Sequence, residues 1–215
     1  MTLKTPTTPK KWVLQATDLF WDAHGKRLWD FETITVPPGV TWVGGGEGRG
    51  KTSFLRTLAA DGVVPTGPLL LGDVAWATQP DAYRERVFWI NPQTDAHDQI
   101  SATQFFANTA AHYPHWDGEL LAHLIAVLGI QPHLDKPLYM HSTGSKRKVW
   151  LAAALSSGAT LTLLDMPFAA LDQTSISHVL EFLNAAAQHP RRAWVVADYA
   201  PPRGVSLSLQ IDLGD

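Results

Sequence analysis

One glycine-rich segment, residues 45–53, contains residue types at a spacing that suits the binding of phosphate. It matches the pattern G-x-x-x-x-G-K-[ST], which begins at Gly45 and ends at Thr52. Glycines let the backbone curl so that successive N–H groups point at phosphate oxygens. The pattern therefore predicts that Lys51 reaches the β and γ phosphates of a nucleotide and that the Thr52 hydroxyl ligates Mg²⁺.

The surroundings of this loop distinguish it from a chance match in a glycine-rich turn. Average composition gives such a match in about one chain in a hundred of this length. Here an apolar, strand-like segment at residues 41–44 precedes the loop, and a helical pattern at residues 51–60 follows it. The positive N-terminal end of that helix would strengthen a phosphate site. We therefore predict that the loop binds ATP together with Mg²⁺.

A phosphate loop of this kind needs a carboxylate at the end of a neighbouring strand to hold the metal ion. The run at residues 161–164 ends in Asp165 and is apolar on both faces apart from Thr162. Such a run is typical of a central parallel strand that is covered on both sides. Taken alone, Asp165 would be read as the start of a turn before Pro167. Beside a phosphate loop, it is interpreted as the metal-binding carboxylate.

Composition limits the class of protein. The chain has 215 residues, of which 45% are hydrophobic and 17% are charged, as is typical of a globular domain with or without a sub-domain. The net charge of -3 argues against nucleic acid as a partner. The chain lacks cysteine, which excludes disulfides and thiolate metal sites. No apolar run reaches the roughly 18 residues that cross a bilayer, so a membrane role would need a separate partner.

Residues 1–10 are polar and rich in proline and threonine, without the apolar stretch of a secretory signal, so they are expected to form a flexible tail. Residues 11–215 are expected to form a single α/β domain with a helical insertion. Apolar runs predict strands at residues 12–16, 33–36, 41–44, 87–90, 161–164 and 193–197. Periodic patterns predict helices at residues 51–60, 102–112, 120–128, 145–155 and 175–188.

Further motifs, in a fixed order, give the chain a resemblance to a known family. The loop also reads G-x-x-G-x-G-K-[ST]-[ST], which is formed by Gly45, Gly48, Gly50, Lys51, Thr52 and Ser53. Residues 88–93, F-W-I-N-P-Q, form a strand followed by Pro-Gln, and residues 165–172 read D-M-P-F-A-A-L-D. With these motifs the sequence resembles the ATP-binding subunits of ABC transporters over nearly its whole length. The compact length, the helix after the loop and the short C-terminus are similar to the haem-exporter (cytochrome c maturation) branch.

The resemblance implies a P-loop NTPase fold of the ABC type. This fold has a central, mostly parallel sheet, an N-terminal antiparallel β part and a helical subdomain, here at about residues 94–157. The resemblance also implies that Gln93 touches Mg²⁺ and the attacking water, so that Thr52, Gln93 and Asp165 surround the metal. An aromatic residue ahead of the loop usually stacks on adenine. Trp21 is predicted to do so, and core packing is the alternative reading for it and for its neighbours Phe20 and Trp29.

In this family two cassettes sandwich two ATP molecules, and each site is completed by the partner's signature, usually L-S-G-G-Q. The equivalent segment, residues 141–145, reads H-S-T-G-S. The resemblance implies that Ser142 and Gly144 offer a hydroxyl and a backbone N–H to the γ-phosphate of the partner's ATP. The other three positions depart from the pattern. The Lys-Arg-Lys cluster that follows, at residues 146–148, is interpreted as a solvated helix face.

Two positions at the chemical centre also depart from the family. Met166 stands where a glutamate polarises the attacking water, and a thioether cannot take that proton. A general base contributes roughly 10²- to 10⁴-fold in rate. Asp198 stands where a histidine contacts the γ-phosphate, and a carboxylate there repels phosphate unless Mg²⁺, Lys51 or a proton offsets it. The sequence predicts ATP binding with slow turnover. A rival hypothesis is that Asp198 replaces the missing base from another direction.

The leading functional hypothesis is a cytoplasmic ATP-binding subunit, peripheral to the inner or plasma membrane, that pairs with a second ABC subunit and a transmembrane permease. ATP-dependent dimer closure would drive transport, and the helical segment at about residues 94–157 would contact the permease. The second subunit could be a copy of this chain or a more active cassette. The alternative function is a regulatory ATP-binding module of the ABC type that does not transport. The remaining histidines, such as His97, show no spacing typical of a metal site.

Overall fold

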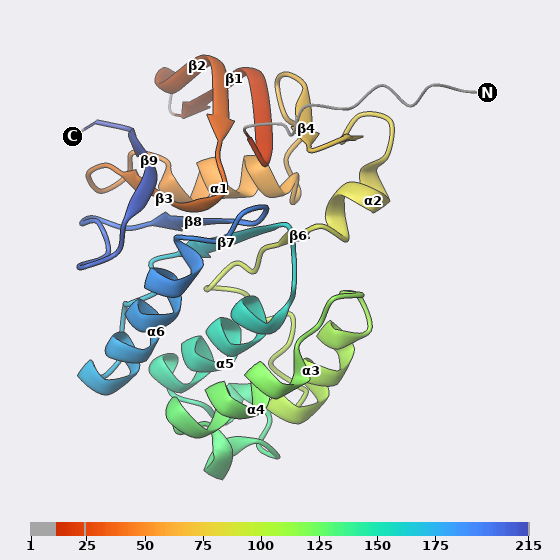
Figure 1. Ribbon diagram of the computed structural model, residues 1–215, viewed down its shortest axis with the longest axis vertical. Coiled ribbons are helices and arrows are strands. Elements are labelled where there is room, and N and C mark those ends of the chain that lie inside the picture. Colours follow the sequence, from red (N-terminus) through yellow and green to blue (C-terminus); the bar gives the residue numbers. More distant parts are fainter. Residues whose placement is uncertain (1–11, 24, 215) are drawn as a thin grey trace.

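The computed structural model describes residues 12–23 and 25–214, and these residues form two sheets and a set of helices (Figure 1). The first sheet is antiparallel and has the strand order β2-β1-β4-β5. The second is parallel and has the order β6-β7-β8-β3-β9. The α/β fold class predicted from the sequence is confirmed. The predicted tail at residues 1–10 lies outside the described residues.

The antiparallel sheet is built around a long hairpin. Its strands are β1 (Leu14–Ala23), β2 (Lys26–Val36), β4 (Leu69–Leu71) and β5 (Val74–Ala75). The register of β1 against β2 shifts between Trp21 and Asp22. The hairpin therefore extends well beyond the short strand predicted at residues 12–16.

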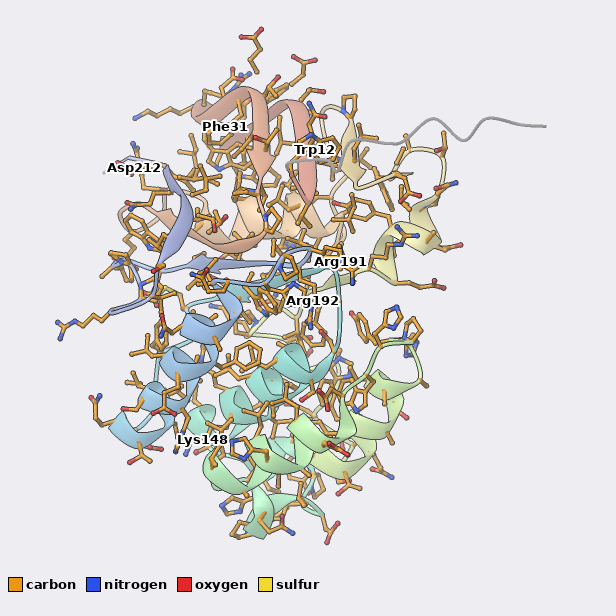
Figure 2. The ribbon with its side chains drawn as sticks, in the orientation of Figure 1. Trp12, Phe31, Lys148, Arg191, Arg192 and Asp212 are labelled. Carbon is orange, nitrogen blue, oxygen red and sulfur yellow. The ribbon has the colours of Figure 1, made fainter. Side chains whose placement is uncertain are left out.

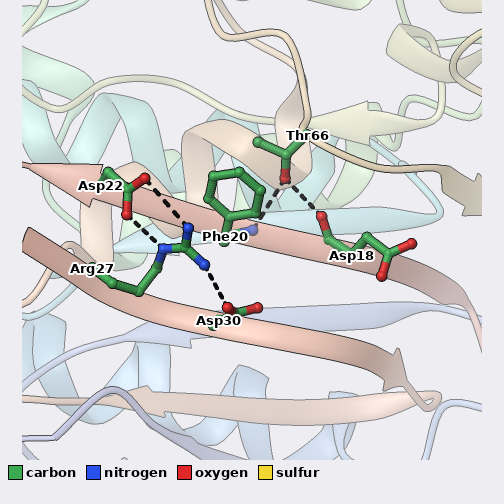
Figure 3. A network of polar contacts seen from close by, with 6 residues as sticks. All are labelled: Asp18, Phe20, Asp22, Arg27, Asp30 and Thr66. Atoms are coloured by element: carbon green, nitrogen blue, oxygen red, sulfur yellow. Dashed lines mark hydrogen bonds and ion pairs between the residues drawn. The ribbon is translucent and has the colours of Figure 1, made fainter.

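A polar cluster lies toward the turn end of this hairpin (Figure 3). Arg27 pairs with Asp22 at 2.5 Å and also with Asp30, while its guanidinium lies 3.9 Å from the centroid of the Phe20 ring. Thr66 donates to the Asp18 carbonyl at 2.8 Å and accepts from the Phe20 N–H at 3.1 Å. Exposed ion pairs of this kind contribute about 0–1 kcal/mol each, so the cluster orders the hairpin more than it stabilises the fold.

The parallel sheet positions the ends of its strands at one edge. Its strands are β3 (Gly39–Gly44), β6 (Val87–Phe88), β7 (Leu161–Asp165), β8 (Ala193–Ala197) and β9 (Leu207–Asp212). Every residue of β7 and β8 is buried, as the apolar runs predict. Since the strands are parallel, the residues that follow β3, β7 and β8 meet at the same edge.

Two apolar cores lie on opposite faces of this sheet. On one face Val195 packs with α1 and the antiparallel sheet, and on the other Trp194 and Val196 pack with the helices. Phe31 lies on the side of the antiparallel sheet and Lys148 on the side of the helices (Figure 2). The helices are α1 (Lys51–Ala59), α2 (Pro80–Arg84), α3 (Ala102–Ala110), α4 (Gly118–Val127), α5 (Thr143–Ser156) and α6 (Gln173–Ala186).

Side-chain caps fix where several helices begin. Ser101 and Gln104 form a capping box at α3, Asp117 caps α4 and Asp172 caps α6. The helices α3, α4 and α5 fall within the segment predicted to be a helical subdomain, below the sheets in Figure 1. In the part of the chain that the structure describes, no helix is both long enough and apolar enough to cross a bilayer.

Candidate nucleotide site

The phosphate loop leaves the end of β3 and leads directly into α1. Gly50 caps the helix in a left-handed conformation, with φ at 82°. A Cβ at this position would lie 2.9 Å from the Trp29 indole nitrogen, so glycine is required here on two grounds. Gly45 and Gly48 also have positive φ, and Ser53 lies in the first turn of α1. The loop therefore has the curled backbone that the sequence predicts.

Lys51 lies across the mouth of this loop. Its Nζ donates to the carbonyl oxygens of Gly45 at 2.6 Å and Gly46 at 2.8 Å. The same ammonium lies over the Tyr199 ring, 4.1 Å from the centroid. Burial lowers the pKa of Lys51, and the nearby carboxylates of Asp165 and Asp198 act against that shift. An ammonium has three N–H donors, so two carbonyl partners leave one donor for a further acceptor.

Thr52 and Asp165 meet directly, across 113 positions of sequence. The Thr52 hydroxyl donates to Oδ2 of Asp165 at 2.7 Å. The other carboxylate oxygen, Oδ1, is buried and has no hydrogen-bond partner among the described residues. Burial raises the pKa of Asp165, while the Thr52 hydrogen bond, Arg147 and Lys51 act in the opposite direction. A hydroxyl beside an unsatisfied carboxylate oxygen is the donor set that a hard cation such as Mg²⁺ prefers.

Met166 and Asp198 lie at the ends of neighbouring strands, as predicted. The Met166 N–H donates to the Ala197 carbonyl at 2.8 Å, and the Asp198 N–H donates to the Val43 carbonyl at 3.1 Å. Met166 has a positive φ of 48°, a strained conformation for a residue with a side chain. Burial raises the pKa of Asp198, and the hydrogen bond from the Tyr199 N–H and the charge of Lys51 lower it.

The Lys-Arg-Lys cluster is not the solvated helix face that the sequence was interpreted to show. Lys146 pairs with Asp98 at 2.5 Å and Lys148 pairs with Asp172 at 2.6 Å. Arg147 donates to the backbone carbonyls of Asp165 at 3.0 Å and Met166 at 2.6 Å. The interpretation was wrong because the first turns of α5 pack against the segment that follows β7, where acceptors replace water. Of the three, Arg147 joins α5 to the candidate site, while Lys146 and Lys148 join it to Asp98 and to the Asp172 cap of α6.

The sequence pattern of the family described as "ABC transporter" matches residues 33–169, which is more than half of the chain. The chain belongs to this family. A family member of this kind is the ATP-binding subunit of a transporter and an ABC-type ATPase, so the leading prediction of function is confirmed at that level.

Individual relatives indicate which branch of the family this chain is similar to. The cytochrome c biogenesis ATP-binding export protein of Pseudomonas syringae is 30% identical over 187 residues, which cover 86% of each chain. The corresponding protein of Escherichia coli O6:H1 is 29% identical over 193 residues, again 86% of each chain. These relatives confirm the predicted likeness to the cytochrome c maturation branch, and they give no support to the regulatory module considered as the alternative.

Solved structures confirm the ABC-type cassette fold. An ATP-binding protein from Pyrococcus furiosus, described as a putative ABC transporter, has a TM-score of 0.73 at 21% identity, over 93% of this chain and 96% of that chain. An ATP-binding subunit of another ABC transporter has a TM-score of 0.75 at 20% identity, over 86% of this chain and 79% of that chain. At this level of identity, both structures show that the fold is similar.

The segment predicted to be the signature, residues 141–145, leads into the start of α5. Ser142 caps the helix and accepts from the Ser145 N–H at 3.1 Å, and its side chain is exposed. Gly144 lies against the loop after β7, since a Cβ there would be 2.4 Å from the Ala170 carbonyl oxygen. Ser142 is therefore open to a partner, while Gly144 is fixed against its own chain. Their contact with a partner's ATP stays a prediction.

Gln93 makes no direct contact that would join it to Thr52 and Asp165, the two other predicted metal ligands, among the hydrogen bonds of the described residues. Gln93 lies exposed in the loop after β6, and its N–H donates to Oδ1 of Asn91 at 3.0 Å. Its role at the metal stays a prediction. No group of three or more His, Cys, Asp or Glu side chains in the described ranges is arranged to hold a metal on its own.

The three aromatic candidates for adenine differ in exposure. Trp29 is 5% exposed and contacts Phe54 in the core, so the core-packing interpretation applies to it. The Phe20 ring is covered by Arg27. Trp21 is half-buried and stacks on Trp29, with 6.4 Å between ring centroids. Trp21 remains the predicted adenine contact.

Two residues of the site escaped sequence reasoning. Arg147 was grouped with its charged neighbours, and only the packing of α5 against β7 reveals its contacts. Tyr199 was not considered, although it directly follows Asp198 and therefore had to lie near the same strand end. That adjacency was a usable signal.

Proposed function

We propose that this chain binds Mg-ATP at residues 45–53 and drives export through a membrane permease, as an ATP-binding subunit of the cytochrome c biogenesis type. The observation that carries the proposal is the 2.7 Å contact between Thr52 and Asp165 beside a curled glycine loop. The likeness to the export proteins supports the choice of branch. The subunit would lie on the cytoplasmic side of the inner or plasma membrane, held there by the permease.

Different residues of the site would bind the phosphates and the Mg²⁺ ion of Mg-ATP. The backbone N–H groups of the loop and the N-terminus of α1 would hold the phosphates, and the Lys51 ammonium, beside its two carbonyl partners, would reach the β and γ phosphates. Thr52 and Asp165 would hold Mg²⁺, and Gln93 would join them from its loop. When bound, Mg²⁺ neutralises phosphate charge and orients the γ-phosphoryl group.

Turnover at this site would be slow. Asp198 carries its carboxylate where the family contacts the γ-phosphate, and Met166 offers no proton acceptor. The positions of both residues at the strand ends support this reading. ATP would then act chiefly by holding two cassettes together, and a partner cassette with intact catalytic residues would supply most of the hydrolysis.

The permease would dock at a groove beside Gln93. A groove of about 730 Å³ lies between α2, the loop after β6 and α3. Its lining includes the aromatic and apolar side chains of Trp89, Ile90, Phe105 and Tyr113, and charged side chains of α2 lie at its wall. A short apolar helix of the permease fits a groove of this character. The loop that carries Gln93 starts in the groove wall, so docking and nucleotide binding would affect the same segment.

Equilibrium binding of ATP, with Mg²⁺ or with EDTA, tests the proposal directly. We expect Mg²⁺ to strengthen ATP binding. Asp165→Asn should lower the affinity gained from Mg²⁺ by about tenfold or more. Asp81→Asn, at an exposed side chain, is the control and should leave that gain unchanged. The molecular size of the complex should be measured with and without ATP, for the chain alone and with candidate cassettes and permeases. The proposal fails if ATP does not bind, or if a saturating ATP concentration leaves the size unchanged with every candidate cassette.

A further inference from the structure

Tyr199 reaches the centre of the nucleotide site from the end of β8. Its ring lies under the Lys51 ammonium, with 4.1 Å between Nζ and the ring centroid, although 56% of its surface is exposed. Its backbone N–H donates to Oδ1 of Asp198 at 2.7 Å, which fixes the turn that aims the ring. An exposed tyrosine in contact with the lysine that is predicted to bind phosphate would lie next to the phosphates of a bound nucleotide.

Apart from Lys51, the side chains that directly follow β7 and β8 at this point, Met166 and Asp198, are poor donors of a hydrogen bond to a phosphate. Asp198 as a carboxylate only accepts, and Met166 has a weakly accepting sulfur. The family's histidine, which would contact the γ-phosphate, is missing from position 198. A phenol hydroxyl is a donor at neutral pH, so Tyr199 carries the chemistry that its neighbour lacks.

We propose that the Tyr199 hydroxyl donates a hydrogen bond to the γ-phosphate of ATP and so makes this site prefer ATP to ADP. The proposal rests on the nucleotide binding proposed above and assigns to Tyr199 the discrimination between nucleotides. The hydroxyl projects from the ring that Nζ covers. One phosphate oxygen can therefore accept from Nζ at about 2.8 Å and from the phenol at about 2.7 Å.

The engagement of Asp198 supports this arrangement. One of its carboxylate oxygens already accepts from the Tyr199 N–H, which ties the carboxylate to the backbone beside the ring. The turn at residues 198–199 thus holds the Asp198 carboxylate in place and carries the Tyr199 hydroxyl. ADP has no γ-phosphate and would still meet Lys51 and the loop, so the hydroxyl affects only the triphosphate.

The test compares the dissociation constants of Mg-ATP and Mg-ADP for the wild type and Tyr199→Phe. Phenylalanine keeps the ring under Lys51 and removes only the hydroxyl. We expect ATP binding to weaken roughly tenfold or more, as for a hydrogen bond to a charged group, while ADP binding stays within about twofold. Tyr139→Phe, at another exposed tyrosine, is the matched control and should change neither constant.

Thermal unfolding of both variants establishes that they are folded. An unchanged ratio of the two constants in Tyr199→Phe overturns the proposal, whether ATP and ADP binding stay the same or weaken together. A wild type that binds neither nucleotide instead contradicts the proposed function. The two failures are therefore distinguishable.

Discussion

The Arg147 guanidinium donates a hydrogen bond to the Met166 carbonyl at 2.6 Å. Arg147 belongs to α5, whose first residues are the predicted signature, and Met166 directly follows Asp165, the predicted metal ligand, at the end of β7. This contact joins the candidate nucleotide site to the predicted signature segment. The same helix begins at the Ser142 cap, so the contact fixes the start of α5 against the segment after β7.

Arg147→Gln should weaken both the fold and this connection. The change removes a charged donor from two backbone carbonyls, and such hydrogen bonds contribute about 1.5–3 kcal/mol. We expect a loss of that order in the free energy of unfolding, measured by denaturant titration. Arg191→Gln, at an exposed arginine, is the control and should cost less than about 0.5 kcal/mol. Equal losses in both variants would contradict the role given to Arg147.

Gly144→Ala should be destabilising because of a backbone clash. The new Cβ would lie 2.4 Å from the Ala170 carbonyl oxygen, so α5 or the loop after β7 must shift. Overpacking of this kind costs typically about 1–3 kcal/mol. Gly118→Ala, in the first turn of α4, meets nothing within 4 Å and should be neutral or slightly stabilising. Thermal unfolding of the two variants checks the prediction, and similar stabilities would refute it.

Met166→Glu should accelerate ATP hydrolysis. It places a carboxylate beside Asp165, where the family has its general base, and a base contributes roughly 10²- to 10⁴-fold in rate. The steady-state rate of phosphate release, at saturating Mg-ATP, measures the effect. Met166→Gln controls for size and polarity and should remain slow. A wild-type rate near ten per second, the typical value for enzymes, would rule out the slow site.

Asp198→Asn should raise stability at neutral pH. Since burial raises the pKa of Asp198, the folded state binds more protons than the unfolded state between the ordinary and the raised pKa. Stability therefore falls as pH rises through that window. Asparagine removes this penalty, so the advantage of Asp198→Asn should be full above the raised pKa and shrink as pH falls through it. Denaturant titrations at several pH values test this, with Asp95→Asn, at an exposed loop carboxyl, as the control. An advantage that is independent of pH would contradict it.

Sequence reasoning succeeded where the local signal and the tertiary environment agree. The buried strands β7 and β8 read as apolar runs, and the ends of both strands were predicted to carry Asp165 and Asp198. The strands β4 and β5 were missed because they have only three and two residues, too few for an alternation of apolar and polar residues to be seen. The edge strand β9 was missed as well, although its alternation of exposed and less exposed residues follows from Leu-Ser-Leu-Gln-Ile-Asp.

The contacts of Arg147 could not be predicted in the same way. A Lys-Arg-Lys run at the start of a helix has the same pattern whether it faces water or another segment. Only the position of α5 against β7 decides this, and that position depends on residues far apart in the sequence. The pairing of Thr52 with Asp165 was predictable in kind, because motif spacing implied it, but its direct hydrogen bond was not.

The first turn of the phosphate loop is completed by residues from the far end of the chain. The Leu213 N–H donates to the Gly44 carbonyl at 3.0 Å, and the Gly46 N–H donates to the Gly214 carbonyl at 2.9 Å. During synthesis, the loop therefore lacks these partners until residue 214 has left the ribosome. A nascent chain that stops before β9 would carry the whole G-x-x-x-x-G-K-T sequence without the two hydrogen bonds that brace its first turn.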